Sequence, residues 1–190
     1  YQEISLIDEQ IGRLRKTLRD LKIANNTLLW YTSDNGGLVK EYSGGREKKG
    51  SIYEGGLRVP SLIEYPSKFT PSRIAAPASS TDIYPTLLAL TKIEIENQPP
   101  VDGISLLPFL TGEKSKRSKP IGFWHNFTGG QSTRSDRIIK ELMEAQQNGQ
   151  PNPFPERVLK NVNVFPEYTA NSHQSGHAAL LDWPLKIHAI

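Results

Sequence analysis

The sequence predicts an α/β protein in which helices cover a layered sheet. Three observations support this fold class. An amphipathic helix opens the chain, a short and almost continuously apolar strand follows it, and a second apolar strand comes after a long glycine-rich connection. Helices that alternate with apolar strands are typical of α/β layered sheets, so this arrangement is the expected architecture.

The first helix is expected over residues 3–22, where apolar residues recur at intervals of three and four. They form one stripe, made of Ile4, Ile7, Ile11, Leu14, Leu18 and Leu21. Burying each such side chain is worth about 1.5–3 kcal/mol before entropy, so we expect the stripe to pack against another part of the protein.

Two expected strands enclose the most informative stretch of the chain. Residues 27–33 ("TLLWYTS") have the composition of a strand buried on both faces of a parallel sheet, and residues 59–66 ("VPSLIEYP") form the second candidate. About 25 residues separate them, and compact domains seldom keep so long a connection without a function. Ligands of open α/β sheets bind at the carboxyl ends of strands, where Asp34 and Asn35 fall.

The rest of the sequence predicts two more helices, followed after residue 113 by a C-terminal part with both helix and strands. Helices are expected at 80–91 and within 102–112, where Gly112 ends the second one. After residue 113 the connectors become rich in Pro and Asn, with a strand expected in "PIGFWHNF", a helix at 134–148 and two short strands split at Trp183-Pro184. We therefore divide the chain into residues 1–112 and 113–190.

Composition restricts the classes of function. Hydrophobic residues make up 36% and charged residues 23% of 190 residues, as in soluble globular proteins, and no apolar run approaches the roughly 20 residues that span a bilayer. The absence of cysteine excludes disulfides, thiolate catalysis and Cys-ligated zinc. The net charge is only +3, and aromatic residues do not alternate with the basic ones, so neither a membrane nor nucleic acid is an expected partner.

The stretch "DNGG" at 34–37 has two interpretations. Asn-Gly supplies the positive φ angles of a hairpin turn, which is the structural one. A carboxylate beside an amide oxygen is also a pair of hard ligands suited to Ca²⁺ or Mg²⁺. Lys48 and Lys49, flanked by glycine, would then bring an ammonium group to an anionic substrate, which favours the second interpretation.

Four segments together carry a resemblance to a known family. In their order and spacing, "NNTLLWYTSDNGG", "KKGSIYEGGLRVP", "STDIYPTLLALT" and "DGISLLPFLTG" resemble the C-terminal half of a sulfatase, a family of the alkaline-phosphatase-like superfamily. The resemblance covers roughly residues 1–112 and is thin beyond 113, although "LLDWPLKIHAI" is similar to a strand pair of the family's smaller subdomain. It implies part of an alkaline-phosphatase-like layered sheet, followed by the start of a small α+β subdomain.

The resemblance also implies roles for individual residues. Asp34 and Asn35 match the pair that ligates the active-site divalent ion, usually Ca²⁺, and Lys49 matches the catalytic lysine that contacts the sulfate group of the substrate. The implied activity is hydrolysis of a sulfate ester, and the implied location is periplasmic or extracellular. A structural role in shaping the loop is implied for Glu54, Gly55, Gly56 and Arg58.

Other parts of the family's site do not occur in this sequence. The family's nucleophile is a formylglycine made from the first residue of Cys/Ser-x-Pro-x-Arg, and the segment "FTPSR" at 69–73 has Phe69 in that position, so we reject it. His125, His173, His177 and His188 do not form a recognisable metal motif. The chain is therefore expected to be a fragment, inactive by itself, whose partner is the N-terminal portion of the same protein.

Three other interpretations remain open. A phosphate- or phosphonate-ester hydrolase of the same superfamily would use the same anion and divalent ion, and a non-catalytic module would use the loop as an anion or glycan clamp. In a purely structural domain, residues 35–37 would turn a hairpin in which Thr27–Ser33 runs antiparallel to Leu38–Tyr42.

Overall fold

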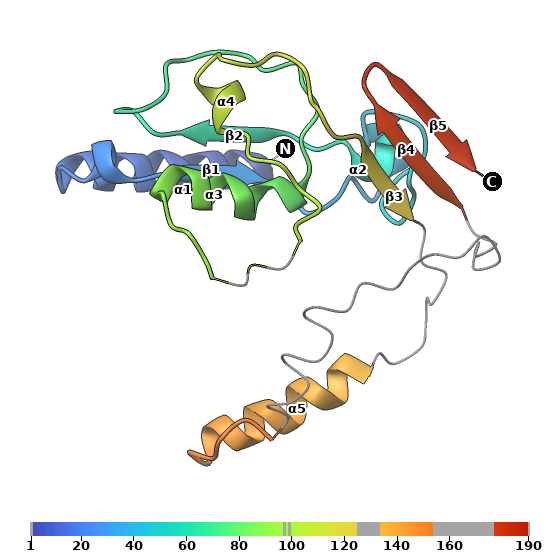
Figure 1. Cartoon of the computed structure of the whole chain (residues 1–190). Coiled ribbons are helices and arrows are strands. Elements are labelled where there is room, and N and C mark those ends of the chain that lie inside the picture. The colour runs from blue at the N-terminus through green and yellow to red at the C-terminus, as the bar shows by residue number, and fades with distance from the viewer. Residues whose placement is uncertain (1, 97, 99, 125–133, 154–176, 190) are drawn as a thin grey trace.

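The computed structural model describes residues 2–96, 98, 100–124, 134–153 and 177–189 (Figure 1). The described residues form helices and two small sheets. The elements, in chain order, are α1 (Gln2–Asp20), η1 (Ala24–Asn26), β1 (Leu29–Thr32), η2 (Lys40–Tyr42), α2 (Glu54–Leu57), β2 (Ser61–Glu64), η3 (Ser80–Asp82), α3 (Ile83–Thr91), α4 (Leu107–Leu110), β3 (Ile121–Trp124), α5 (Arg134–Gln147), β4 (Ala178–Asp182) and β5 (Leu185–Ala189). None of the described helices combines the length and the apolar character needed to cross a membrane.

The first sheet corrects one expectation. β1 and β2 pair antiparallel, with Leu29 opposite Glu64 and Thr32 opposite Ser61, and the second half of β1 is exposed. A parallel pair needs a crossover element on one face of the sheet, whereas only a 3₁₀ turn and a four-residue helix connect these strands. As a consequence, the end of β1 and the start of β2 lie at the same edge.

Helix α1 forms as the apolar spacing predicts, but its stripe is not covered by the described residues. Only Ile11 and Leu18 are half-buried, while Ile4 keeps 67% of its surface exposed. An ion pair joins the helix to the first sheet, because the Arg15 guanidinium donates to both carboxylate oxygens of Glu64 at 2.6 and 3.2 Å. That hydrogen bond and the charge of Glu64 raise the pKa of Arg15.

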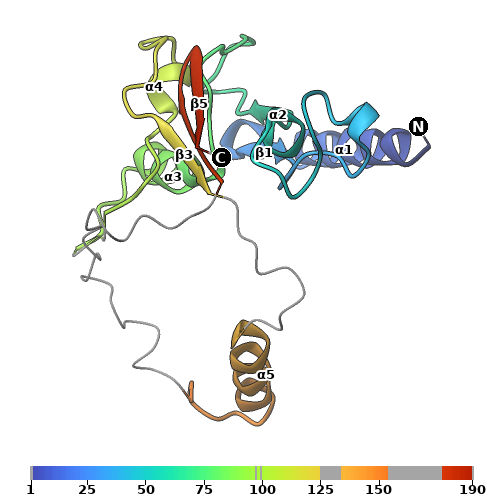
Figure 2. The ribbon, with the colours of Figure 1, turned by 90° about the vertical axis from the view of Figure 1, so that its right-hand side faces the viewer.

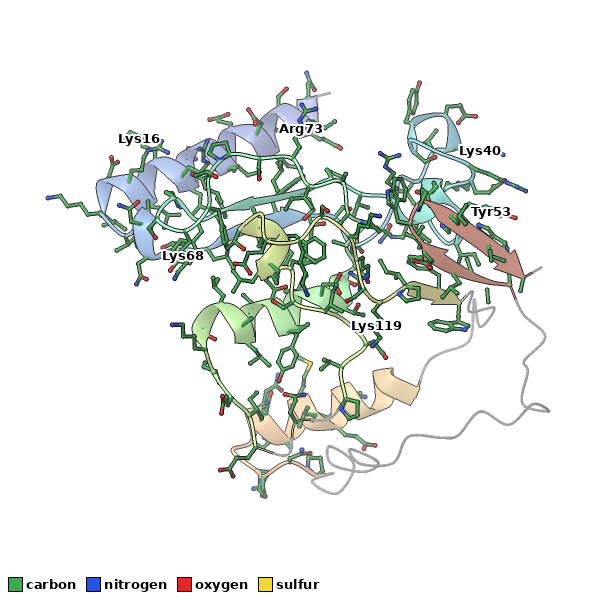
Figure 3. All side chains as sticks on the ribbon, turned by 45° about the horizontal axis from the view of Figure 1, so that its top comes forward. Lys16, Lys40, Tyr53, Lys68, Arg73 and Lys119 are labelled. Atoms are coloured by element: carbon green, nitrogen blue, oxygen red, sulfur yellow. The ribbon has the colours of Figure 1, made fainter. Side chains whose placement is uncertain are left out.

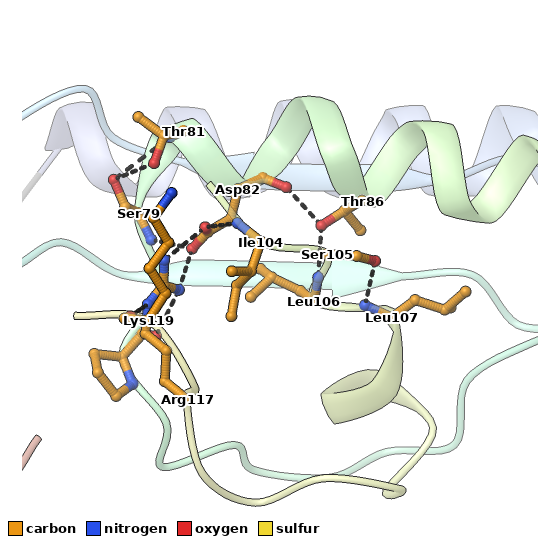
Figure 4. Close-up of polar contacts among 11 residues, drawn as sticks. Ser79, Thr81, Asp82, Thr86, Ile104, Ser105, Leu106, Leu107, Arg117 and Lys119 are labelled. Carbon is orange, nitrogen blue, oxygen red and sulfur yellow. Dashed lines mark hydrogen bonds and ion pairs between the residues drawn. The ribbon is translucent and has the colours of Figure 1, made fainter. Parts of the chain in front are cut away.

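The best-buried polar centre of the described chain lies at the start of α3 (Figure 4). Asp82 is fully buried, and its carboxylate accepts hydrogen bonds from the backbone N–H groups of Ser79 and Ile104, each at 2.8 Å. The Arg117 guanidinium donates to both oxygens of the same carboxylate, at 2.6 and 2.9 Å. These bonds tie the segment before β3 to the first part of the chain across the domain boundary predicted at residue 112, which stays a prediction.

The second sheet has the antiparallel order β3-β4-β5 and follows the strands expected near both ends of the C-terminal part. Figure 1 shows this sheet beside α2, and in Figure 2 α1 extends away from it. The few strongly buried apolar residues of the described chain lie in three places. Ile52 is in the glycine-rich loop, Leu106 and Phe109 are at α4, and Ile121 and Ala179 are in the second sheet. The helices expected at 80–91, 102–112 and 134–148 are confirmed as α3, α4 and α5, the middle one shortened to a single turn.

Candidate functional site

Two sequence motifs meet at the edge of the first sheet. The N–H of Gly36, in the turn after β1, donates to the carbonyl oxygen of Gly56 at 2.9 Å. The N–H of Lys49 donates to the carbonyl oxygen of Gly37 at 2.8 Å. The antiparallel register of β1 and β2 makes this contact possible, because it brings α2 and the loop before it back to the end of β1.

The glycines of both motifs are required by close backbone contact. A Cβ atom on Gly36 would lie 1.9 Å from the carbonyl oxygen of Gly55, and one on Gly55 would lie 2.0 Å from that of Glu47. A Cβ atom on Gly56 would lie 2.2 Å from the carbonyl oxygen of Ser51. Any side chain at these three positions would therefore push the turn and the loop apart.

A buried serine that sequence reasoning missed lies inside the loop. Ser43 is 7% exposed, and its hydroxyl oxygen lies 2.6 Å from the carbonyl oxygen of Glu47 and 2.9 Å from that of Lys40. One hydroxyl proton serves one acceptor at a time, so the shorter contact is the stronger candidate bond. Glu47 itself has φ = 64°, a conformation that non-glycine residues rarely adopt. No motif in the sequence marks Ser43.

The three side chains predicted to form the site lie on this joined pair of segments. Asp34 and Lys49 are exposed and Asn35 is half-buried. Within the part of the chain that the structure describes, none of the three side chains makes a hydrogen bond or an ion pair. Lys49 is followed by Gly50 at φ = 90°, a turn that favours glycine. We call Asp34, Asn35 and Lys49 together the rim.

The rim has the chemistry of part of an ion and anion site. It offers a carboxylate, an amide oxygen and an ammonium group on a backbone that hydrogen bonds hold together. No group of three or more His, Asp or Glu side chains within reach of one metal ion occurs among the described residues. The hairpin interpretation is wrong, because β1 pairs with β2 and residues 40–42 form a 3₁₀ turn.

Residues of the same loop also take part in an aromatic and basic cluster (Figure 3 labels Tyr53). The Tyr53 ring stacks on His188 at 4.5 Å between centroids, meets the edge of His177 at 5.2 Å, and lies 4.0 Å from the Arg46 guanidinium carbon. Burial, and then the positive charges of Lys186, His177 and Arg46, lower the pKa of His188. Sequence reasoning missed this cluster because one half of it, Arg46 and Tyr53, lies more than a hundred positions before the other half, His177 and His188.

The other sequence candidates stay outside the rim. Arg73 of the rejected "FTPSR" segment is exposed (Figure 3), and Phe69 contacts the Tyr65 ring edge-on at 6.0 Å between centroids. Arg58 makes no ion pair within the described ranges. His125 and His173 lie outside the described residues.

An open groove of about 470 Å³ lies between the second sheet and the start of α3. Its walls are mostly apolar and include Ile121, Trp124, Leu180 and Ile187, with Arg117 and Lys119 at its polar end. None of the rim residues lines it. The rim is therefore a separate and more exposed surface.

Comparison with known proteins agrees with the resemblance to sulfatases. Residues 1–93 match the sequence model of the sulfatase family. The chain is 33% identical over 143 residues to the steryl-sulfatase of Mus musculus, an alignment that covers 63% of this chain and 23% of that protein. It is 33% identical over 147 residues to a sulfatase of Formosa agariphila, with 70% and 26% covered. It is 34% identical over 122 residues to the choline-sulfatase of Rhizobium meliloti, with 64% and 23% covered. The chain spans about a quarter of the length of these relatives.

Proposed function

Because the chain belongs to the sulfatase family through residues 1–93, we propose that its rim forms one side of the active site of a sulfuric ester hydrolase. Asp34 and Asn35 are the proposed ligands of a divalent cation, Ca²⁺, and Lys49 is the proposed contact to the sulfate group. The observation that carries the proposal is the pair of backbone hydrogen bonds, Gly36 to Gly56 and Lys49 to Gly37, which hold the lysine loop against the acidic turn.

The donor atoms fit a hard cation. Ca²⁺ prefers carboxylate and amide oxygens and takes six to eight of them, so Asp34 and Asn35 would supply about a quarter to a third of its ligands. A bound cation of this kind would act as a Lewis acid toward a sulfuryl oxygen. Both side chains stay without partners in the described part of the chain, which leaves their oxygens available for coordination.

Lys49 would act on charge at the ester. An ammonium about 4 Å from a negative charge gains about 4 kcal/mol at an effective dielectric constant of 20. Negative charge grows on the leaving ester oxygen in the transition state, so the attraction to the ammonium is stronger there than in the bound substrate. Only stabilisation of this kind, specific to the transition state, accelerates the reaction. The hydrogen bond from the Lys49 backbone N–H to Gly37 supports this role, since it fixes the point from which the side chain reaches the substrate.

The proposed substrate class is defined by the sulfate and not by the alcohol. The names of the similar proteins include a steryl-sulfatase, a choline-sulfatase and an arylsulfatase, whose common element is the sulfate group. The rim residues are likewise suited to an anion and a cation. We therefore propose a sulfate ester without assigning the alcohol part.

The proposed active site also requires residues from elsewhere in the protein. The sequence contains no Cys/Ser-x-Pro-x-Arg segment that would carry the formylglycine. We accordingly propose that the N-terminal portion of the same polypeptide is the partner of the rim. The chain shown here, given Ca²⁺ and an aryl sulfate, is expected to produce no turnover.

Adjacent lysines provide the main experiment, in the full-length gene product. Lys49→Met is expected to lower kcat/KM for an aryl sulfate by about 100-fold or more, which is the usual cost of removing one transition-state contact. Lys48→Met is the matched control, because Lys48 is also exposed, one position away and without an ion pair in the described ranges. Equal losses for the two variants would contradict the role of Lys49.

The metal ligands are tested by calorimetric titration of Ca²⁺. Asp34→Asn is expected to weaken Ca²⁺ binding, whereas Glu41→Gln, which removes a nearby exposed carboxylate, leaves it unchanged. Unaltered Ca²⁺ affinity in Asp34→Asn would overturn the ligand assignment.

The reaction class is tested by comparing two substrates. A protein that hydrolyses aryl phosphate faster than aryl sulfate would instead be a phosphoryl-ester hydrolase of the same superfamily.

A further inference from the structure

We propose that the C-terminal hairpin β4–β5 positions the loop that carries Lys49, and that Lys186 is the positioning residue. The role of that position in catalysis rests on the proposed function above. The contact between hairpin and loop does not, because it is a property of the fold and has its own measurement.

The Lys186 ammonium provides the central contact. It donates to the carbonyl oxygen of Ile52 at 3.1 Å and to the carboxylate of Glu54 at 2.7 Å. The Lys186 side chain is only 13% exposed, so most of its hydration is replaced by these two acceptors and by the Phe123 ring, whose centroid is 5.1 Å away. One lysine therefore fixes both the backbone of the loop and the first residue of α2.

Tyr53, between these two acceptors, is held as well. Its ring stacks on His188 with an angle of 20° between the planes, and the Arg46 guanidinium lies over it. Ile52 is 4% exposed. The hairpin therefore contacts three consecutive residues, 52–54, and the first of them lies three positions after Lys49.

The orientation of β5 shows that the contact is specific. Lys186 and His188 are two residues apart and share the strand face that meets the loop. Leu185 and Ile187 point to the other face and remain 70% and 69% exposed. The strand thus presents its polar side chains to the loop and its apolar ones away from it. Hydrogen bonds and ring stacking are directional, so they define one position of the loop where apolar contact alone would allow several.

These contacts leave Lys49 held from two sides. Its own N–H is bonded to Gly37 in the acidic turn, and the residues that follow it are bonded to β5. Only Gly50 and Ser51 lie between the two fixed points. Without the contact at β5 the loop gains conformational freedom, and the Lys49 ammonium must lose that freedom again when it meets an anion.

The first measurement is hydrogen exchange by mass spectrometry on the full-length protein. Lys186→Met is expected to raise exchange at residues 46–57 by about tenfold, the effect of losing one charge-assisted contact, while α3 keeps its rate. Lys186→Arg retains the positive charge and is expected to restore most of the protection. Lys16→Met is the control, since Lys16 also pairs with a carboxylate, Asp20, but on α1.

The second measurement is a double-mutant comparison of kcat/KM for an aryl sulfate. Lys186→Met is expected to lower kcat/KM by about tenfold or more, because small misplacements of a substrate contact are costly. If Lys186 acts through Lys49, the double variant Lys49→Met/Lys186→Met is no slower than Lys49→Met alone. A double variant whose loss equals the product of the two single losses would overturn the positioning role.

The outcomes separate this inference from the proposed function. Unchanged exchange at 46–57 in Lys186→Met, or an equal rise in α3, overturns the positioning of the loop whatever the activity is. Faster exchange confined to 46–57 supports it even in a protein that does not hydrolyse sulfate esters, in which case only the proposed function fails.

Discussion

Asp82 and Asp34 are both aspartates next to a segment with turn-forming residues, yet their surroundings are opposite. The Asp82 carboxylate is fully buried and accepts hydrogen bonds from two backbone N–H groups and from both sides of the Arg117 guanidinium (Figure 4). The Asp34 carboxylate is exposed and has no partner within the described residues. In both cases the backbone around the carboxylate is held by hydrogen bonds.

The difference indicates what each carboxylate is for. A buried charge is tolerated only when its hydrogen-bonding capacity is filled, and Asp82 meets that condition with groups of its own chain. A carboxylate that sits on a fixed backbone with its capacity unfilled is available to a ligand. The first is a structural centre and the second is a candidate binding group, although both are the same residue type.

Removing the charge should separate the two aspartates most clearly. Asp82→Asn leaves the Arg117 guanidinium buried without its counter-charge, and we expect a loss of about 3–5 kcal/mol in the free energy of unfolding. Asp34→Asn changes an exposed group and is expected to alter stability by less than about 0.5 kcal/mol. Urea unfolding of both variants provides the measurement. Similar losses for the two variants would remove the distinction drawn between the sites.

The backbone that supports the rim is tested by a pair of glycine substitutions. Gly55→Ala places a methyl group 2.0 Å from the carbonyl oxygen of Glu47, so the loop must move, and we expect a loss of about 1–3 kcal/mol. Gly12→Ala meets no atom within 4 Å and lies inside α1, so it is expected to stabilise the helix by about 0.5–1 kcal/mol. Thermal unfolding compares them, and a neutral Gly55→Ala would contradict the close contact of the two motifs.

The smallest expected effect concerns pH at the hairpin. His188 is disfavoured as a cation by burial and by Lys186, His177 and Arg46, which lower its pKa, while Glu54 acts in the opposite direction. Below the ordinary histidine pKa of about 6.5 the unfolded chain therefore binds more protons at this residue, so the stability of the fold falls as pH falls.

His188→Gln removes that dependence. Thermal unfolding between about pH 8 and pH 5 is expected to show a shallower decline in Tm for the variant than for the wild type. The stacking on Tyr53 is lost at every pH and changes the level of the curve, not its slope. Parallel curves would show that His188 does not titrate differently in the folded state.

Local patterns predicted most elements of this chain, because they depend on neighbouring residues. The interval of three and four apolar residues identified α1, and the apolar runs identified β1, β2 and the strands near the end. The direction of β2 relative to β1 was predicted wrongly, since apolar composition reports burial and carries no information about direction. The same limit applies to α1, whose stripe was identified correctly, because the pattern does not tell which segment covers it, and the described residues leave most of it exposed.

The rim shows which features the sequence alone determines and which depend on tertiary contacts. Residue types and spacing were enough to single out Asp34, Asn35 and the pair Lys48-Lys49, because their chemistry and the glycines beside them are visible along the chain. The resemblance to sulfatases then selected Lys49 from that pair. The backbone hydrogen bonds that join the two segments of the rim, and the contacts of Lys186 with Ile52 and Glu54, arise only when separate parts of the chain fold together. Helix and strand formation is a short-range property of the chain, whereas such contacts join positions up to 134 residues apart, so no local pattern encodes them.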